Sequence, residues 1–452
     1  MNSGSLAPLA AALQAGRLEL GKTRANVLAH RDPPPCPAVP ESGLCYHDGT
    51  MGPAEPSALV ELATAVARAR IAGLVDVFLE RRADVWWRFT RGRVASREAL
   101  LREGAAVRRN GTLASADGLE RQLLAGLLGI TTRALPPFSA PAFADPPRIE
   151  AVLSDVPEGW AAVRWSWHWS AVLVGPRAVI IRTPQLAEIT FADGHRALTV
   201  WPPEVPVGPT ADRRASAVRP RPGRARVLLA PSAAAVLLHE LVGHPLEGDL
   251  LLRRGSGSHG RQGERLVDLR LSVRDDPTLA ELPGAFSSDD EGEPAVAREL
   301  LSDGVIVGAL ADRERASILG VAAGNARRAN VHTRPRPRIS NLVARAADPL
   351  SSPPREEAAL EVTALSSGTV EPASGSILLQ VRAAFALRKG VRTRPLTPFT
   401  LVGSVAGLRS GLVAAAQPTV ATAEPGWCAK DGEVVPTGAV APWLLLSGVE
   451  VR

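Results

Sequence analysis

Two histidines five residues apart constrain the fold of this 452-residue chain more than any other local feature. His239 and His244 close an alanine- and leucine-rich run that begins at Pro231, and proline is favoured in the first turn of a helix. A regular α-helix turns about 100° per residue, so a five-residue step separates two side chains by roughly 140°. The run therefore predicts a buried helix that ends or loosens before His244.

The residues that flank His244 are expected to provide this break. Gly243 is permissive at a helix C-terminus, and Pro245 disfavours the α conformation for the residue before it. His244 can then turn back to bind one zinc ion together with His239, with a third protein ligand and a water molecule completing the coordination. Glu240 is the expected general base for attack of the zinc-activated water on a peptide bond. The alternative is that these are ordinary helix-end residues, because so short a pattern also arises by chance.

Charge gives little support for a nucleic-acid partner. The net charge is +6 and the computed pI is about 9.9, but arginine supplies nearly all of the positive charge. The arginines are interleaved with acidic residues, and their densest group, residues 213–226, lies in a proline-rich stretch typical of a loop. A nucleic-acid-associated regulator is therefore an alternative suggested by charge alone.

Cysteine content and hydropathy predict a cytoplasmic protein. Three cysteines are too few, and odd in number, for a disulfide scaffold, and they indicate a reducing compartment. The N-terminus has no basic segment followed by an apolar one, so we expect no signal peptide. No apolar run approaches the roughly 18 residues that a membrane span needs, so we expect no contact with a membrane.

Proline-rich stretches divide the chain into four expected parts. Residues 1–56 form an extension or linker, residues 57–135 an α/β domain, residues 148–226 a β-rich segment, and residues 227–452 the domain that carries the histidines. The expected fold class is α+β, with an N-terminal α/β domain beside a β-rich C-terminal domain. Cys36, Cys45 and His47 in the extension match no zinc-site spacing, and translation from Met51 would omit them.

The N-terminal domain is expected to alternate helices and strands. Hydrophobic periodicity predicts a helix from Ser57, strands at residues 74–80, 85–89 and 93–110, a turn at Asn110-Gly111, and a helix at residues 115–128. In the next segment Trp165, Trp167 and Trp169 alternate, so they share one face of a strand. Such a row can bind sugars or bases, but a sheet face packed under helices is the favoured interpretation.

The whole segment of residues 237–249, with its H-E-L-V-G-H-P-L-E-G-D run, resembles the active-site segment of the TldD/PmbA family of peptidases. Further motifs of that family follow in the same order, from about residue 57 to the end of the chain. They are residues 263–265, 273–278, 289–294 (D-D-E-G-E-P), 324–328 (G-N-A-R-R), 337–341 (P-R-I-S-N), 375–403 and 428–432 (C-A-K-D-G).

The resemblance implies a zinc peptidase of the catalytic, TldD-like kind. It implies that Cys428 is the third zinc ligand, beside His239 and His244; the other interpretation is a small buried residue. It implies short or unfolded peptides as substrates, including precursors whose leaders are removed, bound as an extended strand on a sheet edge. Family members pair, so a homodimer or a heterodimer with a PmbA-like (TldE) subunit is expected. A catalytically silent member that binds a peptide or a partner subunit is the alternative.

Four residues depart from the family pattern without touching the expected ligands. Ala326 and Ala429 stand where the family has glycine, and Ser366 and Ser367 stand where the family is richer in glycine. These departures bear on substrate binding and leave the expected metal site intact. Glu247 and Asp249 are expected either to support the metal ligands or to be solvated at a helix end.

Overall fold

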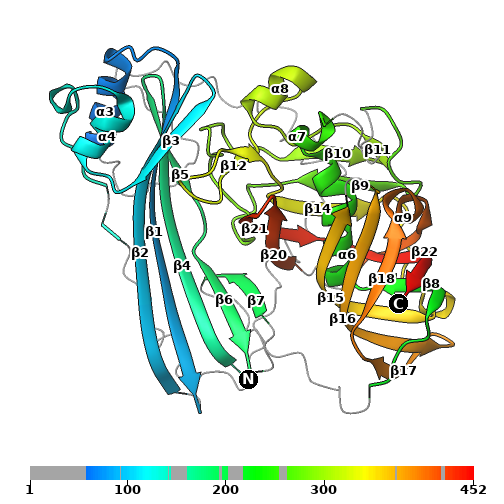
Figure 1. Ribbon diagram of the computed structural model, residues 1–452. Helices are drawn as coiled ribbons and strands as arrows, with labels where there is room; N and C mark the ends of the chain where they lie inside the picture. The colour runs from blue at the N-terminus through cyan, green and yellow to red at the C-terminus, as the bar shows by residue number, and fades with distance from the viewer. Residues whose placement is uncertain are drawn as a thin grey trace, which may run out of the picture.

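The computed structural model describes residues 57–91, 93–140, 142–143, 160–192, 196–201, 217–253, 262–371, 374–418 and 423–452. It consists of two lobes that lie side by side (Figure 1). Long strands with two helices at one end form the first lobe, and two sheets around a helix form the second. The α+β prediction is confirmed. Cys36, Cys45 and His47 lie outside the described residues.

The first lobe is a seven-stranded sheet in the order β3-β2-β1-β4-β6-β7, with β5 paired to β4. The two segments that the proline-rich stretch separates in the sequence share this sheet, because β1 pairs antiparallel with β4. Its elements are α3 (Ser57–Arg68), β1 (Leu74–Thr90), β2 (Arg93–Arg109), β3 (Thr112–Asp117), α4 (Arg121–Leu128), β4 (Trp160–Val174), β5 (Arg177–Arg182), β6 (Leu186–Phe191) and β7 (Arg196–Val200).

Three predicted elements of this lobe are wrong in part. The strands expected at residues 74–80 and 85–89 are one strand, β1, because Asp84 between them is buried against arginines of the neighbouring strands. The helix expected at residues 115–128 begins only at Arg121. Residues 115–117 belong instead to β3, which pairs with β2 through the predicted Asn110-Gly111 turn, where both residues have the positive φ of a tight hairpin.

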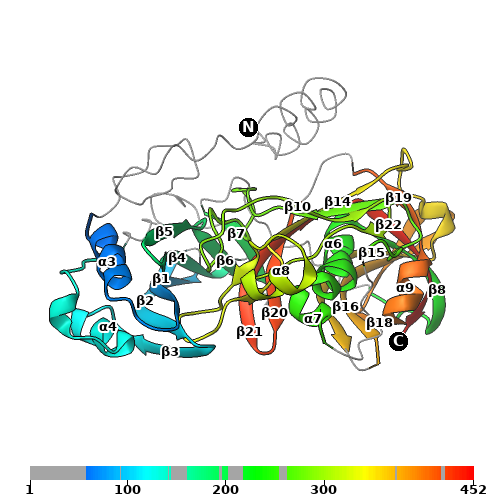
Figure 2. The ribbon, with the colours of Figure 1, turned by 90° about the horizontal axis from the view of Figure 1, so that it is seen from above.

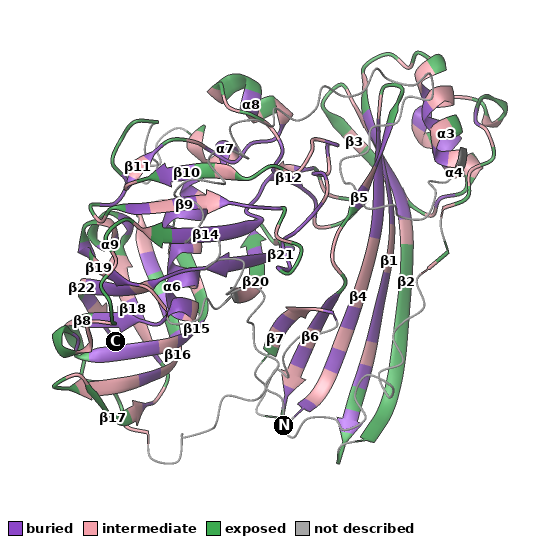
Figure 3. Cartoon of the chain, turned by 180° about the vertical axis from the view of Figure 1, so that it is seen from behind, coloured by how far each residue is buried: buried purple, intermediate pink, exposed green. Residues whose placement is uncertain are grey.

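The two faces of the first sheet differ in character. Trp165 and Trp169 are buried in apolar clusters on the face that α3 and α4 partly cover, and Trp167 packs between them. The favoured interpretation, a sheet face packed under helices, therefore holds for Trp169, which packs with residues of α3 and α4; the cluster around Trp165 contains no helical residue that the structure describes. The opposite face is polar, because Arg82 and Asp84 of β1 alternate with buried apolar residues. The outer half of β2 is exposed (Figure 3).

The second lobe holds α6 (Pro231–Leu238) between two sheets, and α6 contributes to the largest apolar cluster of the structure (Figure 2). One sheet has the order β11-β10-β9-β14-β21-β20. It comprises β9 (Leu271–Asp275), β10 (Arg298–Ser302), β11 (Val305–Ile306), β14 (Asn341–Ala346), β20 (Ala423–Lys430) and β21 (Glu433–Val440).

The other sheet has the order β15-β8-β22-β18-β16-β17, with β19 paired to β22. It comprises β8 (Gly223–Leu229), β15 (Leu360–Glu371), β16 (Ser376–Arg388), β17 (Val391–Leu396), β18 (Phe399–Ser404), β19 (Leu412–Ala416) and β22 (Trp443–Val451). The remaining elements are α7 (Gly248–Leu251), α8 (Arg313–Leu319), α9 (Val405–Gly411), β12 (Ala326–Arg327) and β13 (Arg336–Pro337).

A buried ion network joins the two lobes. Arg108 of β2 contacts Asp76 of its own lobe and Glu291 of the other, at 2.6 Å in the second pair. Arg328, from the second lobe, reaches Asp76 at 3.4 Å and stacks on Phe78. Because these charges are buried and paired, they hold the lobes in a defined orientation. Within the described ranges, no helix combines the length and apolar character that crossing a membrane requires.

Candidate metal centre

After α6 the chain forms a wider helical turn, which accommodates the five-residue spacing of the two histidines. His239–Gly243 is a π-helical turn, in which the backbone N–H of His244 donates to the carbonyl of His239. Such a turn holds about one residue more than the 3.6 of an α-helix, so side chains five residues apart return to one face. The two imidazole centroids lie 4.8 Å apart.

The expected causes of this break are corrected by the structure. His244 keeps α-helical dihedrals, with φ −57° and ψ −44°, so Pro245 does not drive it out of the α region. Gly243, at φ −63°, does not use the left-handed conformation of a helix cap. A Cβ on Gly243 would lie 2.5 Å from Cδ1 of Ile339. Glycine is needed here because the turn packs directly against that side chain.

Cys428 joins the two histidines from the far end of the chain. It lies on β20 with no exposed surface, 184 residues beyond His244, and its Sγ is 3.8 Å from Nε2 of His244. The donor atoms of His239, His244 and Cys428 all lie within 4.8 Å of one another. The structure thus brings together the three residues that the sequence nominates as ligands.

These donors fit a tetrahedral zinc-like ion. With metal–nitrogen bonds of about 2.1 Å and metal–sulfur bonds of about 2.3 Å, tetrahedral geometry holds nitrogen and sulfur about 3.6 Å apart, close to the observed separation. Burial raises the pKa of the Cys428 thiol, but His244 and His239 lower it well below its usual range. The thiol is therefore ready to lose its proton, as a metal ligand must.

A buried lysine and two acidic residues form a hydrogen-bonded group beside His244. Oε2 of Glu247 lies 3.1 Å from Nδ1 of His244 and accepts a hydrogen bond of 2.9 Å from Lys430. Lys430 also donates to Asp249 at 2.9 Å and to the carbonyl of Pro337 at 2.7 Å. Burial raises the pKa of Glu247, yet His244 and Lys430 outweigh it and lower that pKa to about 2. The carboxylate therefore fixes the orientation of the His244 ring.

Lys430 is a residue of the site to which the sequence analysis assigns no role, although one feature of the sequence points to it. Lys430 follows Cys428 by two residues on a strand, which places both side chains on the same face. Of Glu247 and Asp249, the structure places the first wholly inside the protein and the second near its surface.

Glu240 faces a cavity of about 850 Å³, which His239 and His244 also line. Its side chain lies against Gly368 of β15, where an added Cβ would be 2.5 Å from Cγ of Glu240 and 3.3 Å from Oε1. Gly368 thus leaves the space that the Glu240 carboxylate occupies. Among the departures from the family pattern, Ser366, Ser367 and Ala429 line this cavity, whereas Ala326 is buried elsewhere.

If Glu240 is the general base that the sequence analysis expects, Gly368→Ala should lower kcat for peptide cleavage by about 10²-fold, because the methyl group displaces Glu240 and small misplacements of a reacting group carry costs of this size. Metal content should stay at the wild-type level. Gly126→Ala is the matched control, since Gly126 lies in α4 of the first lobe and an added Cβ there meets no atom within 4 Å. Equal kcat values for the two variants would contradict the assigned contact.

Comparison with known proteins identifies the family. Residues 222–452 match the model of the PmbA/TldA metallopeptidase C-terminal domain, which is half of the chain. The chain belongs to the PmbA/TldD family. A metalloprotease TldD homolog of Haemophilus influenzae is 31% identical over 241 residues, covering 52% of this chain and 50% of the relative. A metalloprotease of Archaeoglobus fulgidus is 30% identical over 232 residues, covering 51% and 53%.

These matches to curated relatives span about half the length of each relative. Solved structures of PmbA/TldD type cover more of the chain and show the fold. TldE from Thermococcus kodakarensis superimposes with a TM-score of 0.60 at 14% identity, over 87% of this chain and all of that one. A putative modulator of DNA gyrase from Thermotoga maritima gives a TM-score of 0.59 at 14% identity, over 87% and 99%.

Proposed function

We propose that this member of the PmbA/TldD family is a zinc-dependent peptidase that hydrolyses short or unfolded peptides, including precursor or leader peptides. The observation that carries the proposal is the convergence of His239, His244 and Cys428 on a cavity that Glu240 also lines. Two imidazoles and one thiolate are a donor set that suits zinc, and three protein ligands are typical of a catalytic zinc site.

The proposed chemistry divides between the ion and the chain. A zinc ion in this position would supply Lewis-acid chemistry, polarising a peptide carbonyl and making water acidic enough to attack near neutral pH. Glu240 would accept the proton of the attacking water and pass it to the departing amine. Glu247 would hold His244 in its ligating orientation through the 3.1 Å contact with Nδ1.

Two strand edges beside the cavity support an extended, unfolded substrate. β20 is the last strand of its sheet, and its residues 424–427 line the cavity. β15 pairs with β8 only over residues 360–362, and its residues 365–370 line the cavity. A peptide backbone laid along either edge would form main-chain hydrogen bonds that make little demand on sequence. A globular substrate would have to unfold locally to present such a strand.

Metal analysis combined with peptide cleavage tests the proposal. Wild type is expected to hold one zinc ion per chain and to lose cleavage in a chelator, with recovery on zinc addition. Cys428→Ala should lose most of its metal and its activity. Val435→Ala is the matched control, because Val435 is the buried cross-strand partner of Cys428 and carries no ligand atom. A wild-type chain that binds peptides without metal or cleavage would instead be the catalytically silent alternative.

Assembly and location also belong to the proposal. We propose that the chain pairs with a second copy or with a PmbA-like subunit in the cytoplasm. Light scattering of the purified chain, alone and with such a subunit, measures which pairing occurs. A monomer under both conditions would contradict it.

A further inference from the structure

A second cavity, of about 690 Å³, lies between the two lobes and continues from the metal cavity. Both cavities are lined by Glu188, Arg196, Trp427 and Ala429. Trp427 and Ala429 flank the ligand Cys428 on β20, and their side chains are exposed where that of Cys428 is buried. A peptide that crosses the metal site along β20 would therefore pass Trp427 into the second cavity.

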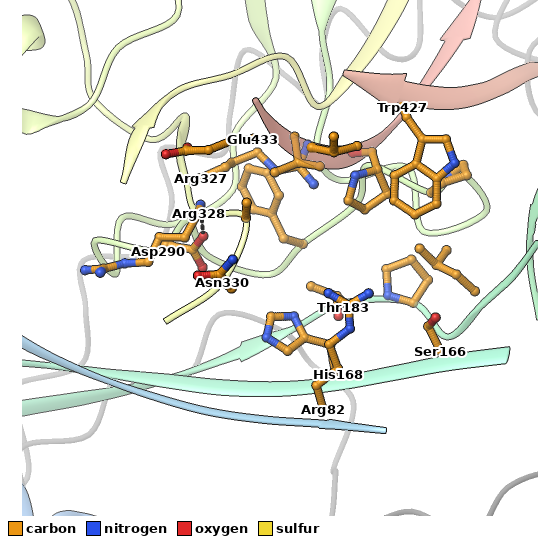
Figure 4. Close-up of a pocket in the computed structure, with 18 of the residues that line it drawn as sticks. Arg82, Ser166, His168, Thr183, Asp290, Arg327, Arg328, Asn330, Trp427 and Glu433 are labelled. Atoms are coloured by element: carbon orange, nitrogen blue, oxygen red, sulfur yellow. Dashed lines mark hydrogen bonds between the residues drawn. The ribbon is translucent and has the colours of Figure 1, made fainter. Parts of the chain in front are cut away.

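One wall of the second cavity is the polar face of the first sheet. Arg82, Ser166 and His168 extend from the strands toward the opposite wall, which includes Trp427 and Glu433 (Figure 4). Beneath them the carboxylate of Asp84 is completely buried among three arginines. It lies 3.0 Å from Arg82, 2.9 Å from Arg102 and 2.9 Å from Arg164, and accepts a 2.7 Å hydrogen bond from Ser166.

Positive charge exceeds negative charge on this wall. Glu188 is the next carboxylate along, and it lies 3.6 Å from Arg164 and 3.5 Å from Arg196. Glu80, on the same face of β1, pairs with His168 at 3.2 Å, so among the described residues four guanidinium groups in these contacts stand against three carboxylates. The Arg196 side chain is 70% exposed, so its second face is available to a ligand. A cavity with walls of low dielectric strengthens such an excess.

The acidic residues of the opposite wall do not offset this excess at the opening. Asp289 accepts hydrogen bonds from the backbone N–H groups of Glu291, Glu293 and Ala326, and Asp290 accepts one from that of Arg328. These carboxylates are thereby directed into their own loop, and Glu433 of the same wall lies 3.6 Å from Arg336. From the sheet, the guanidinium groups of Arg82, Arg164 and Arg196 line the cavity together with one carboxylate, that of Glu188.

We infer that this second cavity binds a carboxylate of the peptide, on one side of the bond that the metal site cleaves. The inference rests on the proposed peptidase function and names a substrate class, peptides with an acidic group a few residues from the scissile bond. Arg196 is the group assigned to contact that carboxylate, since a guanidinium matches a carboxylate with two parallel hydrogen bonds. Nε and Nη2 of Arg164 already donate to Asp84, so Arg164 contributes its charge to the wall. The carboxylate comes from an acidic side chain or from the C-terminus of the peptide.

Calorimetric binding to the zinc-loaded Glu240→Gln protein tests the inference without cleavage. The probes are ten-residue peptides that carry one Glu or its isostere Gln at successive positions, each with a free or an amidated C-terminus. A charge-assisted contact predicts about tenfold tighter binding for Glu at one or two neighbouring positions, or for the free C-terminus. The first pattern identifies a side-chain carboxylate and the second identifies the terminus.

The same panel is measured with Arg196→Gln added to Glu240→Gln. The preference for the carboxylate should fall from about tenfold to about twofold, and higher salt should reduce the preference of the Glu240→Gln protein as screening predicts. Arg97→Gln is the matched control, because Arg97 is an exposed arginine on the opposite face of the same sheet. The control should keep the full preference.

Three results would overturn the inference. Peptides that bind or are cleaved without any charge preference remove it and leave the peptidase proposal standing. A carboxylate preference that survives Arg196→Gln places the contact elsewhere and also removes it. Failure of every peptide to bind removes it together with the proposed function, whereas charge-selective binding by a wild-type chain that cannot cleave supports the cavity and rejects the peptidase.

Discussion

Replacing Glu240 with glutamine is expected to lower kcat for peptide cleavage by about 10²–10⁴-fold, the range that a positioned general base contributes. Zinc content should equal that of wild type, because Glu240 is not among the three clustered donors. Glutamine has nearly the same shape, so the Gly368 contact is retained, but an amide cannot take a proton from water. Single-turnover cleavage and metal analysis on the same samples measure both quantities.

Two further variants separate loss of the base from a general disturbance. Glu240→Asp keeps a carboxylate but withdraws it by one methylene, so its kcat should lie between those of wild type and Glu240→Gln. Glu314→Gln changes an exposed carboxylate of α8, 70% accessible, and should cleave as wild type does. Wild-type kcat in Glu240→Gln would rule out the base assigned here.

Glu247→Gln is expected to affect both stability and metal affinity. The carboxylate is fully buried between Lys430 and His244, and removing one partner of a buried ion pair costs about 3–5 kcal/mol. Loss of such an outer contact to a metal ligand typically lowers metal affinity by about 10–100-fold. Denaturant unfolding of the metal-free protein gives the first quantity, and competition with a chromophoric chelator gives the second.

Asp249→Asn distinguishes the two roles of Glu247. Asp249 contacts the same Lys430 ammonium at 2.9 Å, but its side chain is 14% exposed and the Nδ1 partner of His244 is Glu247. We therefore expect a smaller loss of stability and unchanged metal affinity. If Asp249→Asn weakened zinc binding as much as Glu247→Gln, general loosening of the site would explain both, and the orienting role of Glu247 would fall.

Predictions from local pattern succeeded where neighbouring residues settle the conformation. Pro231 begins α6 as expected, and Asn110-Gly111 turns β2 into β3. The same approach divided β1 at its polar middle, since Asp84 reads as a break in an apolar pattern. Arg102 and Arg164, which make Asp84 compatible with a buried strand, come from neighbouring strands. Periodicity within one segment carries no information about such partners.

The histidine spacing shows the same division at the site itself. The five-residue step between His239 and His244 required a departure from the regular α-helix, and that requirement follows from helix geometry alone. The departure is a π-helical turn, and the constraint on Gly243 is the Ile339 side chain from a distant segment. The local sequence attributes the break to Pro245, whereas the structure attributes it to the packing of the turn against Ile339.

The sequence by itself determined the donor types, the distortion that the two histidines demand, and the family motifs that nominate Cys428. Tertiary structure decided that Cys428 lies 3.8 Å from His244, that Lys430 is buried against Glu247, and that Gly368 makes room for Glu240. The reason is physical. Helical and strand periodicity act over a few residues, whereas these contacts depend on which strand edges meet when the apolar cluster around α6 is buried.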